Sequence, residues 1–85
     1  MKHLHYDLNL TSSDSVQVSL DKQANVMLLD SSNYQRYKKA QQFKYYGGRA
    51  THSPTYVSPP CAGHWHLVID LGGYPGRVSA SVSIV

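Results

Sequence analysis

Hydrophobic and polar residues alternate along the first part of the chain, as they do in β-strands with one buried face. In the segment 4–10 the apolar positions of this alternation are Leu4, Tyr6, Leu8 and Leu10. A turn cluster at 11–14 separates this segment from a second alternating one, 16–20, and residues 21–25 turn the chain again. The apolar run Val26–Leu29 does not alternate, so it predicts a strand covered on both faces.

Only the segment after this run predicts a helix. Its N-cap is one of Asp30, Ser31 and Ser32, and no proline or glycine interrupts Asn33–Gln42. Tyrosines recur three apart in this segment, and so do cations, so a short helix would carry an aromatic side and a basic side. A helix of one to three turns depends on packing for its stability.

The second half of the chain predicts short strands again. Extended segments are expected over residues 43–46, 51–57, 64–71 and 78–84. We interpret Gly47-Gly48 as the turn that ends the first of them, and Pro54 places the second at an edge or in an irregular stretch. Residues 72–76, Gly-Gly-Tyr-Pro-Gly, carry the strongest turn signal in the sequence.

Six or seven short, mostly antiparallel strands with one short helix predict an all-β fold, a small β-sandwich, as a single domain over residues 1–85. A fold built from successive βαβ units is excluded because only one helix is predicted. The predicted core consists of the inward positions of the alternating segments: Leu4, Tyr6, Leu8, Val16, Val18, Leu20, Val26, Leu28, Trp65, Leu67, Ile69, Val78, Ala80 and Val82. A core of this size gives modest stability, which an edge-to-edge homodimer would increase.

Composition narrows the class of protein. With 15% charged and 41% hydrophobic residues among 85, the chain is not disordered. No apolar run is long enough to span a membrane, and the N-terminus has no apolar signal core, so we expect a cytoplasmic protein. The single cysteine, Cys61, excludes an internal disulfide and a thiolate zinc cluster.

Four blocks of the sequence resemble a bacterial family, the domain of unknown function DUF1883. The blocks are Leu4-His5-Tyr6-Asp7-Leu8, Asn25-Val26 through Asn33-Tyr34-x-x-Tyr37, Tyr45-Tyr46-Gly47-Gly48, and His64-Trp65-His66-Leu67 through Gly72-Gly73 with Gly76-Arg77-Val78. The resemblance covers nearly the whole chain and implies a compact all-β domain. The family occurs alone and ahead of TIR domains, which implies an accessory or sensing role. It implies no catalytic residue.

The whole chain has a net charge of +3. Its positive charge is concentrated in the middle of the sequence. No acid lies between Asp30 and Asp70, where the cations are Arg36, Lys38, Lys39, Lys44 and Arg49. Tyrosine rings, glycines that permit close backbone approach and an arginine fork together suit a small anionic ligand such as a nucleotide or sugar phosphate. The candidate ligand-binding residues are Tyr34, Tyr37, Tyr45, Tyr46, Gly47, Gly48 and Arg49.

Two other interpretations of this region stay open. The tyrosines would equally pack on a sheet edge beside a Gly-Gly turn, and the domain would then act as a protein-interaction or oligomerisation module. A surface for single-stranded nucleic acid would also combine cations with aromatic rings. The local charge is modest and no nucleic-acid-binding motif is present, so we do not expect nucleic acid as a partner.

Two His-x-His pairs, His3/His5 and His64/His66, suggest a metal site as an alternative. Residues i and i+2 of a strand share a face, so each pair could chelate an ion, and Asp7 and Asp70 continue the two faces. If the two strands were neighbours, imidazole nitrogens within about 4 Å of one another would suit zinc, copper or nickel. The alternative is that these histidines face solvent or bond to backbone carbonyls. We therefore expect no obligatory cofactor.

The sequence does not predict an enzyme. It has no Gly-x-Ser-x-Gly element or comparable nucleophile motif. We expect Asp70 to cap the amides of the turn that follows it. A pairing of Cys61 with His64 is conceivable, but a small filler or partly exposed thiol is the simpler interpretation of this cysteine.

Overall fold

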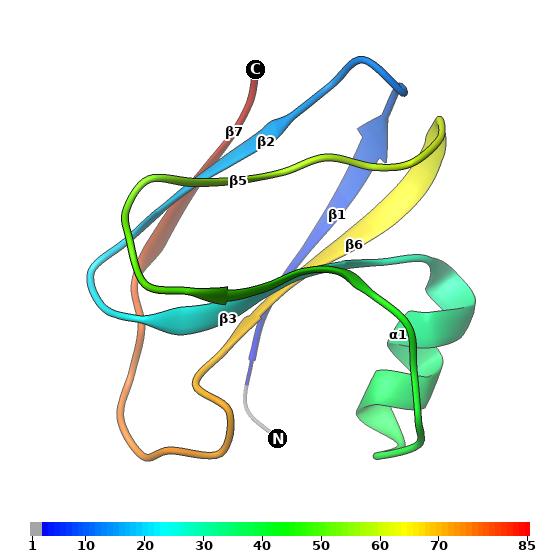
Figure 1. Cartoon of the computed structure of the whole chain (residues 1–85). Coiled ribbons are helices and arrows are strands. Elements are labelled where there is room, and N and C mark those ends of the chain that lie inside the picture. The colour runs from blue at the N-terminus through cyan, green and yellow to red at the C-terminus, as the bar shows by residue number, and fades with distance from the viewer. Residues whose placement is uncertain (1–2) are drawn as a thin grey trace.

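The computed structural model describes residues 3–85, in which seven strands and one helix form two packed layers (Figure 1). The elements are β1 (Leu4–Leu10), β2 (Val16–Leu20), β3 (Ala24–Leu29), α1 (Ser31–Lys38), β4 (Tyr46–Ala50), β5 (Thr55–Val57), β6 (Gly63–Asp70) and β7 (Ala80–Ile84). All strand pairs are antiparallel, in a four-stranded sheet of order β1-β6-β3-β4 and a three-stranded sheet of order β5-β2-β7. The predicted small all-β sandwich with one short helix is confirmed.

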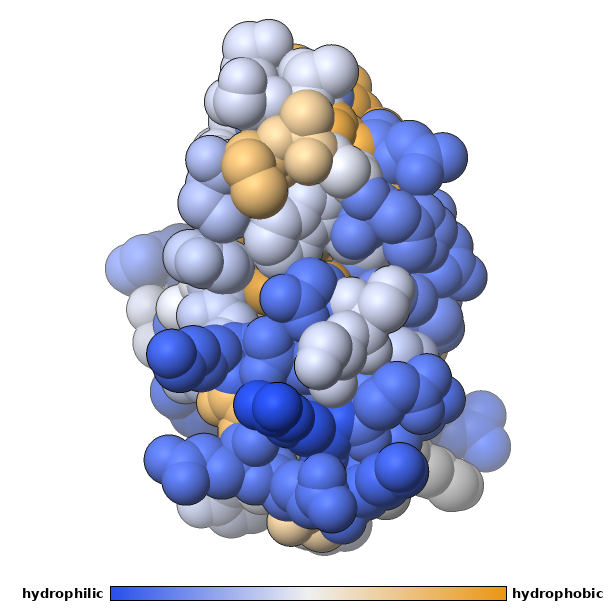
Figure 2. Space-filling model, turned by 90° about the vertical axis from the view of Figure 1, so that its right-hand side faces the viewer, coloured by the Kyte–Doolittle hydropathy of each residue, from blue (hydrophilic) through white to orange (hydrophobic). Residues whose placement is uncertain are grey.

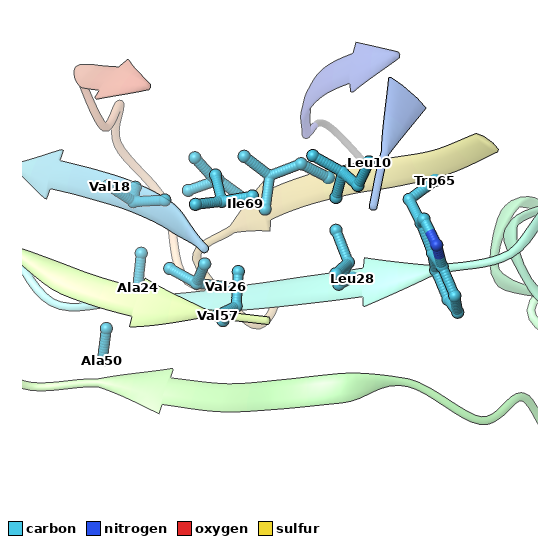
Figure 3. Packing of buried hydrophobic residues seen from close by; sticks show 11 residues of the cluster. Leu10, Val18, Ala24, Val26, Leu28, Ala50, Val57, Trp65 and Ile69 are labelled. Atoms are coloured by element: carbon cyan, nitrogen blue, oxygen red, sulfur yellow. The ribbon is translucent and has the colours of Figure 1, made fainter. Parts of the chain in front are cut away.

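The space between the two sheets holds the main core (Figure 3). Every residue predicted for the core is buried there or packs against it. Leu10 and Val57 complete the cluster, together with the small side chains of Ala24 and Ala50. The period-two pattern predicted this core because a residue's face in a strand depends only on its local position.

A second, smaller apolar cluster lies on the outer face of the four-stranded sheet, beneath α1. It joins Met27 and Leu29 of β3 with Val68 of β6 and Tyr34 of the helix. Both faces of β3 are therefore covered, as the unbroken run Val26–Leu29 predicted. No helix among residues 3–85 is long and apolar enough to cross a membrane.

The helix begins at one of the three predicted caps and has the predicted length. Asp30 is the N-cap and accepts a hydrogen bond from the backbone N–H of Asn33 at 2.8 Å. The helix ends at Lys38, and its eight residues agree with the one to three turns expected from the sequence. Ala40 adopts a φ of 56°, and its N–H and that of Gln41 bond back to the last turn of the helix. This is a Schellman termination with alanine where glycine is usual, so the stop signal was missing from the sequence.

The Gly47-Gly48 pair lies inside a strand and does not form the predicted turn. β4 begins at Tyr46, and its two glycines pair with Met27 and Val26 of β3. Gly47 has a φ of 118°, and a Cβ at this position would overlap the carbonyl oxygen of Val26. The pair therefore allows close backbone approach to a neighbouring strand. β7 also starts later than predicted, at Ala80.

Asp70 joins the end of β6 to three other parts of the chain. Its carboxylate is buried and accepts hydrogen bonds from the N–H of Gly72 and Nδ2 of Asn25, both at 2.9 Å. The Tyr37 hydroxyl donates the third hydrogen bond, at 2.6 Å. The predicted cap of the turn is confirmed. Burial, followed by this bond to a carboxylate, raises the pKa of Tyr37 well above its usual range.

Replacing Gly47 by alanine should destabilise the domain more than the same change at Gly48. The added methyl at 47 meets the backbone of Val26, which cannot rotate away, whereas no atom lies within 4 Å of the corresponding point at 48. Both changes carry the backbone strain of a positive φ. Urea unfolding of Gly47→Ala and Gly48→Ala would measure the difference, expected to be about 1–3 kcal/mol. Equal losses would contradict this role of Gly47.

Tyr37→Phe should flatten the loss of stability at alkaline pH. Above pH 10 the unfolded chain releases the Tyr37 proton while the folded chain retains it. The unfolding free energy of the wild type therefore falls by up to about 1.4 kcal/mol per pH unit from this group. The phenylalanine variant is less stable at pH 7 because Asp70 loses a donor, and it declines less steeply above pH 10. Urea unfolding between pH 7 and 11 would test this, with the exposed Tyr74→Phe as control; parallel pH profiles for all three proteins would refute it.

Candidate functional site

The register of β1 against β6 brings the two His-x-His strands together on the outer face of the four-stranded sheet. Asp7 lies directly opposite His66, and Asn9 opposite His64. His5 is two residues from Asp7, so it lies on the same face. The adjacency that a metal site requires is therefore present, although the two strands are far apart in the sequence.

The cluster is centred on one oxygen of Asp7. This Oδ1 atom lies 3.0 Å from Nε2 of His64 and 3.2 Å from Nδ1 of His66. Nε2 of His5 is 3.7 Å from the same oxygen and 2.8 Å from the His66 nitrogen. The ligand-type atoms of His5, Asp7 and His66 all lie within 4.8 Å of one another. The imidazole spacing anticipated for a metal site is met by His5 and His66.

In His64 and His66, the ring nitrogen that faces away from Asp7 contacts another polar side chain. Nε2 of His66 lies 2.9 Å from the hydroxyl of Ser31, and Nδ1 of His64 lies 3.0 Å from Oδ1 of Asn9. When each of these outer nitrogens carries the ring proton, the nitrogen facing Asp7 presents its lone pair. This is the arrangement in which protein imidazoles bind metal ions.

Helix α1 holds the imidazole planes in place. The ring of Tyr34 stacks on His5 at 4.3 Å and on His66 at 4.6 Å between ring centroids. Asp30 starts the helix immediately before Ser31, so the N-terminal turn positions both the hydroxyl and the ring. Figure 2 views the molecule from the side on which α1 lies in Figure 1, and hydrophilic residues predominate over the lower half of that face.

His3 does not join the cluster. Its Nε2 lies 3.1 Å from the hydroxyl of Tyr34, and its ring meets that of Tyr37 edge-on at 5.0 Å. Of the four histidines considered from the sequence, three surround Asp7 and the fourth supports the tyrosines of the helix.

The pKa values of two ligand-type groups, Asp7 and His66, are shifted within the cluster. A hydrogen bond from His64, and then the charges that the neighbouring imidazoles carry when protonated, lower the pKa of Asp7 despite partial desolvation. Burial lowers the pKa of His66, and the carboxylate of Asp7 opposes this effect only in part. An ionised carboxylate and a neutral imidazole are the forms in which these side chains ligate a metal.

The seven residues predicted as a ligand site are spread over both faces of the sheet. Tyr34 and Tyr37 belong to α1 and pack against the outer face of the four-stranded sheet. Tyr46 packs edge-on against the tryptophan of the inter-sheet core, with 5.9 Å between ring centroids. Tyr45 and Arg49 are exposed, and the two glycines pair with β3. None of the seven lines either of the two cavities found among residues 3–85.

The sequence predicted that Asp7 shares a face with His5, because they are two apart in an alternating strand, but the pairing of β1 with β6 is what places it among the other histidines. The contributions of Ser31 and Tyr34 could not be predicted from the sequence. These residues belong to a helix more than 20 positions away from β1 along the chain, and only packing places them on His66.

The contacts from Ser31 through His66 to Asp7 also have the order of a hydroxyl nucleophile, a base and an orienting carboxylate. His5 competes for the nitrogen of His66 that would face the carboxylate. The contact between His5 and His66 therefore departs from that order at the carboxylate end.

Comparison with known proteins identifies a family. The sequence profile of the family described as "Domain of unknown function (DUF1883)" matches residues 1–85. No curated protein and no solved structure matches the chain. The match agrees with the resemblance carried by the four sequence blocks, and its description assigns no chemistry, so the function has to be inferred from the site.

Proposed function

The chain belongs to the DUF1883 family, and for this member we propose a non-catalytic module that binds a divalent transition-metal ion through His5, Asp7 and His66. One observation carries the proposal: three side chains of ligand type, from two neighbouring strands, hold an oxygen and two nitrogens within 4.8 Å of one another.

The spacing of these atoms suits a tetrahedral ion. Metal–ligand bonds of about 2.0–2.1 Å place tetrahedral ligands about 3.3 Å apart. The separations among the three ligand atoms are 2.8, 3.2 and 3.7 Å, which bracket that value. Small side-chain adjustments would equalise them, because His5 and Asp7 are on the exposed side of the cluster. Two imidazoles and a carboxylate favour zinc, copper or nickel over calcium or magnesium.

The fourth position supports a binding or sensing role. His64 has its Nε2 3.0 Å from the Asp7 oxygen and would supply a fourth ligand by a modest rotation. If it does not, the position is taken by water or by a small anion. The anionic ligand expected from the sequence would then bind to the ion itself. Neither cavity described above is lined by Asp7 or His66, which supports binding without turnover.

A protein-interaction module is the second candidate. The edge strands carry exposed apolar side chains, with Tyr46 48%, Tyr56 57% and Ile84 49% exposed. Such edges suit pairing with another chain. The metal site is preferred because its ligands converge at one point, whereas these side chains are spread over three different edge strands.

Zinc or nickel should bind the purified domain and raise its melting temperature by mass action. Asp7→Asn and His5→Asn should each weaken binding by about 100-fold or more, since each removes one of three ligands. Both residues are exposed, so the fold should survive both changes. His52→Asn, which alters an exposed histidine outside the cluster, is the matched control. Calorimetric titration that gave the same affinity for all four proteins would exclude the site.

Ser31→Ala should weaken the metal affinity by about tenfold, because the ring N–H of His66 loses its acceptor and the ring loses its orientation. The neighbouring, exposed Ser32→Ala should leave the affinity unchanged. The helix cap is Asp30, so neither serine change removes it. An unchanged affinity in Ser31→Ala would mean that the hydroxyl does not support a metal ligand.

A further inference from the structure

A cavity of about 980 Å³ opens at the end of the sandwich where β1 begins and β6 ends. Its walls come from the starting residues of β1, the last residues of β6 and the loop that joins β6 to β7, which is orange in Figure 1. β7 is paired with β2 only from Ala80 onward, so the three-stranded sheet stops short of this end. The core is left uncovered there.

The inner wall of the cavity is apolar. It is formed by Leu4, Ile69, Leu71 and Val78. Ile69 is fully buried in the main core, whereas the other three only pack against that core and remain partly exposed. The cavity therefore continues the hydrophobic interior to the surface, and its volume is in the range that small-molecule sites occupy.

The polar groups at the rim favour an anion. Arg77 lines the cavity, is exposed, and makes no hydrogen bond or ion pair with any residue in 3–85. Nζ of Lys22 lies 3.9 Å from the point that a Cβ on Gly76 would occupy, also at this rim. The one carboxylate in the lining, Asp70, already accepts three hydrogen bonds from the protein. The charged groups at the rim with no partner among residues 3–85 are thus Arg77 and Lys22, both cationic.

We propose that this end cavity binds an amphipathic carboxylate, a molecule with an unbranched hydrocarbon chain and one terminal carboxyl group. The chain lies against the partly exposed side chains of Leu4, Leu71 and Val78, which removes apolar surface of both partners from water. The carboxylate is held by the planar fork of Arg77, with Lys22 adding positive charge.

This site is separate from the metal site. In β1 and β6 the side chains of Leu4 and Ile69 face the space between the sheets, while those of His5, Asp7 and His66 face outward. Binding of the carboxylate therefore requires no metal ion. The Asp7→Asn variant should bind it as the wild type does, so failure of one proposal leaves the other standing.

Titration of the full chain with decanoate, below its micelle-forming concentration, tests the proposal. Decanoate should bind and raise the melting temperature. Acetate lacks the hydrocarbon chain and decyltrimethylammonium lacks the negative charge, so neither should produce a comparable shift. Equal binding of decanoate and decyltrimethylammonium would overturn the proposal, because the cavity would then recognise only apolar surface.

Two variants locate the bound molecule. Arg77→Gln should weaken decanoate binding about tenfold or more through loss of a charge-assisted hydrogen bond. Arg49→Gln, an exposed arginine on the edge strand β4, is the matched control and should have no effect. An unchanged affinity in Arg77→Gln would refute the assignment.

Discussion

The antiparallel pairing of β1 with β6 is the constraint on which the rest of the structure depends. Its register, with Asp7 opposite His66, places leucines and Trp65 between the sheets and the histidines outside. A slip of one residue would reverse both faces of a strand, burying imidazoles and exposing the core. The same pairing thus specifies the hydrophobic interior and assembles the cluster around Asp7. β6 then pairs with β3 on its other side, which fixes the position of the helix that follows β3.

Helix α1 gives the small domain a second layer of buried contacts. Its tyrosines cover Met27, Leu29 and Val68, and one of them binds the buried carboxylate of Asp70. Because the helix is anchored at both ends in this way, its first turn can hold a hydroxyl and a ring against His66. Stability and the candidate site therefore share the same residues. The inner face of the four-stranded sheet carries the apolar side chains of the main core. The cavity lies where this core reaches the end of the sandwich.

The errors of sequence interpretation have local physical causes. The exact end of the helix could not be placed within Asn33–Gln42, because Ala40 adopts a left-handed conformation that glycine usually supplies and its residue type carried no stop signal. The Gly47-Gly48 pair looked like a turn because turns and close strand contacts both require glycine. In β4 the requirement comes from the carbonyl of Val26 in the adjacent strand. The tyrosines of the middle region form a continuous basic and aromatic stretch in the sequence, but the strand and helix that carry them direct them to different faces.

The sequence by itself determined most of the strands, the residues that fill the main core and the turn cap at Asp70, and it narrowed the helix cap to Asp30, Ser31 or Ser32. Each of these depends on residues a few positions apart, whose relative directions are set by the backbone geometry of one element. It also placed His5 and Asp7 on one face, and His64 with His66 on another. Only the tertiary structure decided that these faces adjoin, with His5 and His66 in contact across 61 positions of sequence. Strand neighbours are selected by the burial of the whole sheet, and no local pattern encodes that choice.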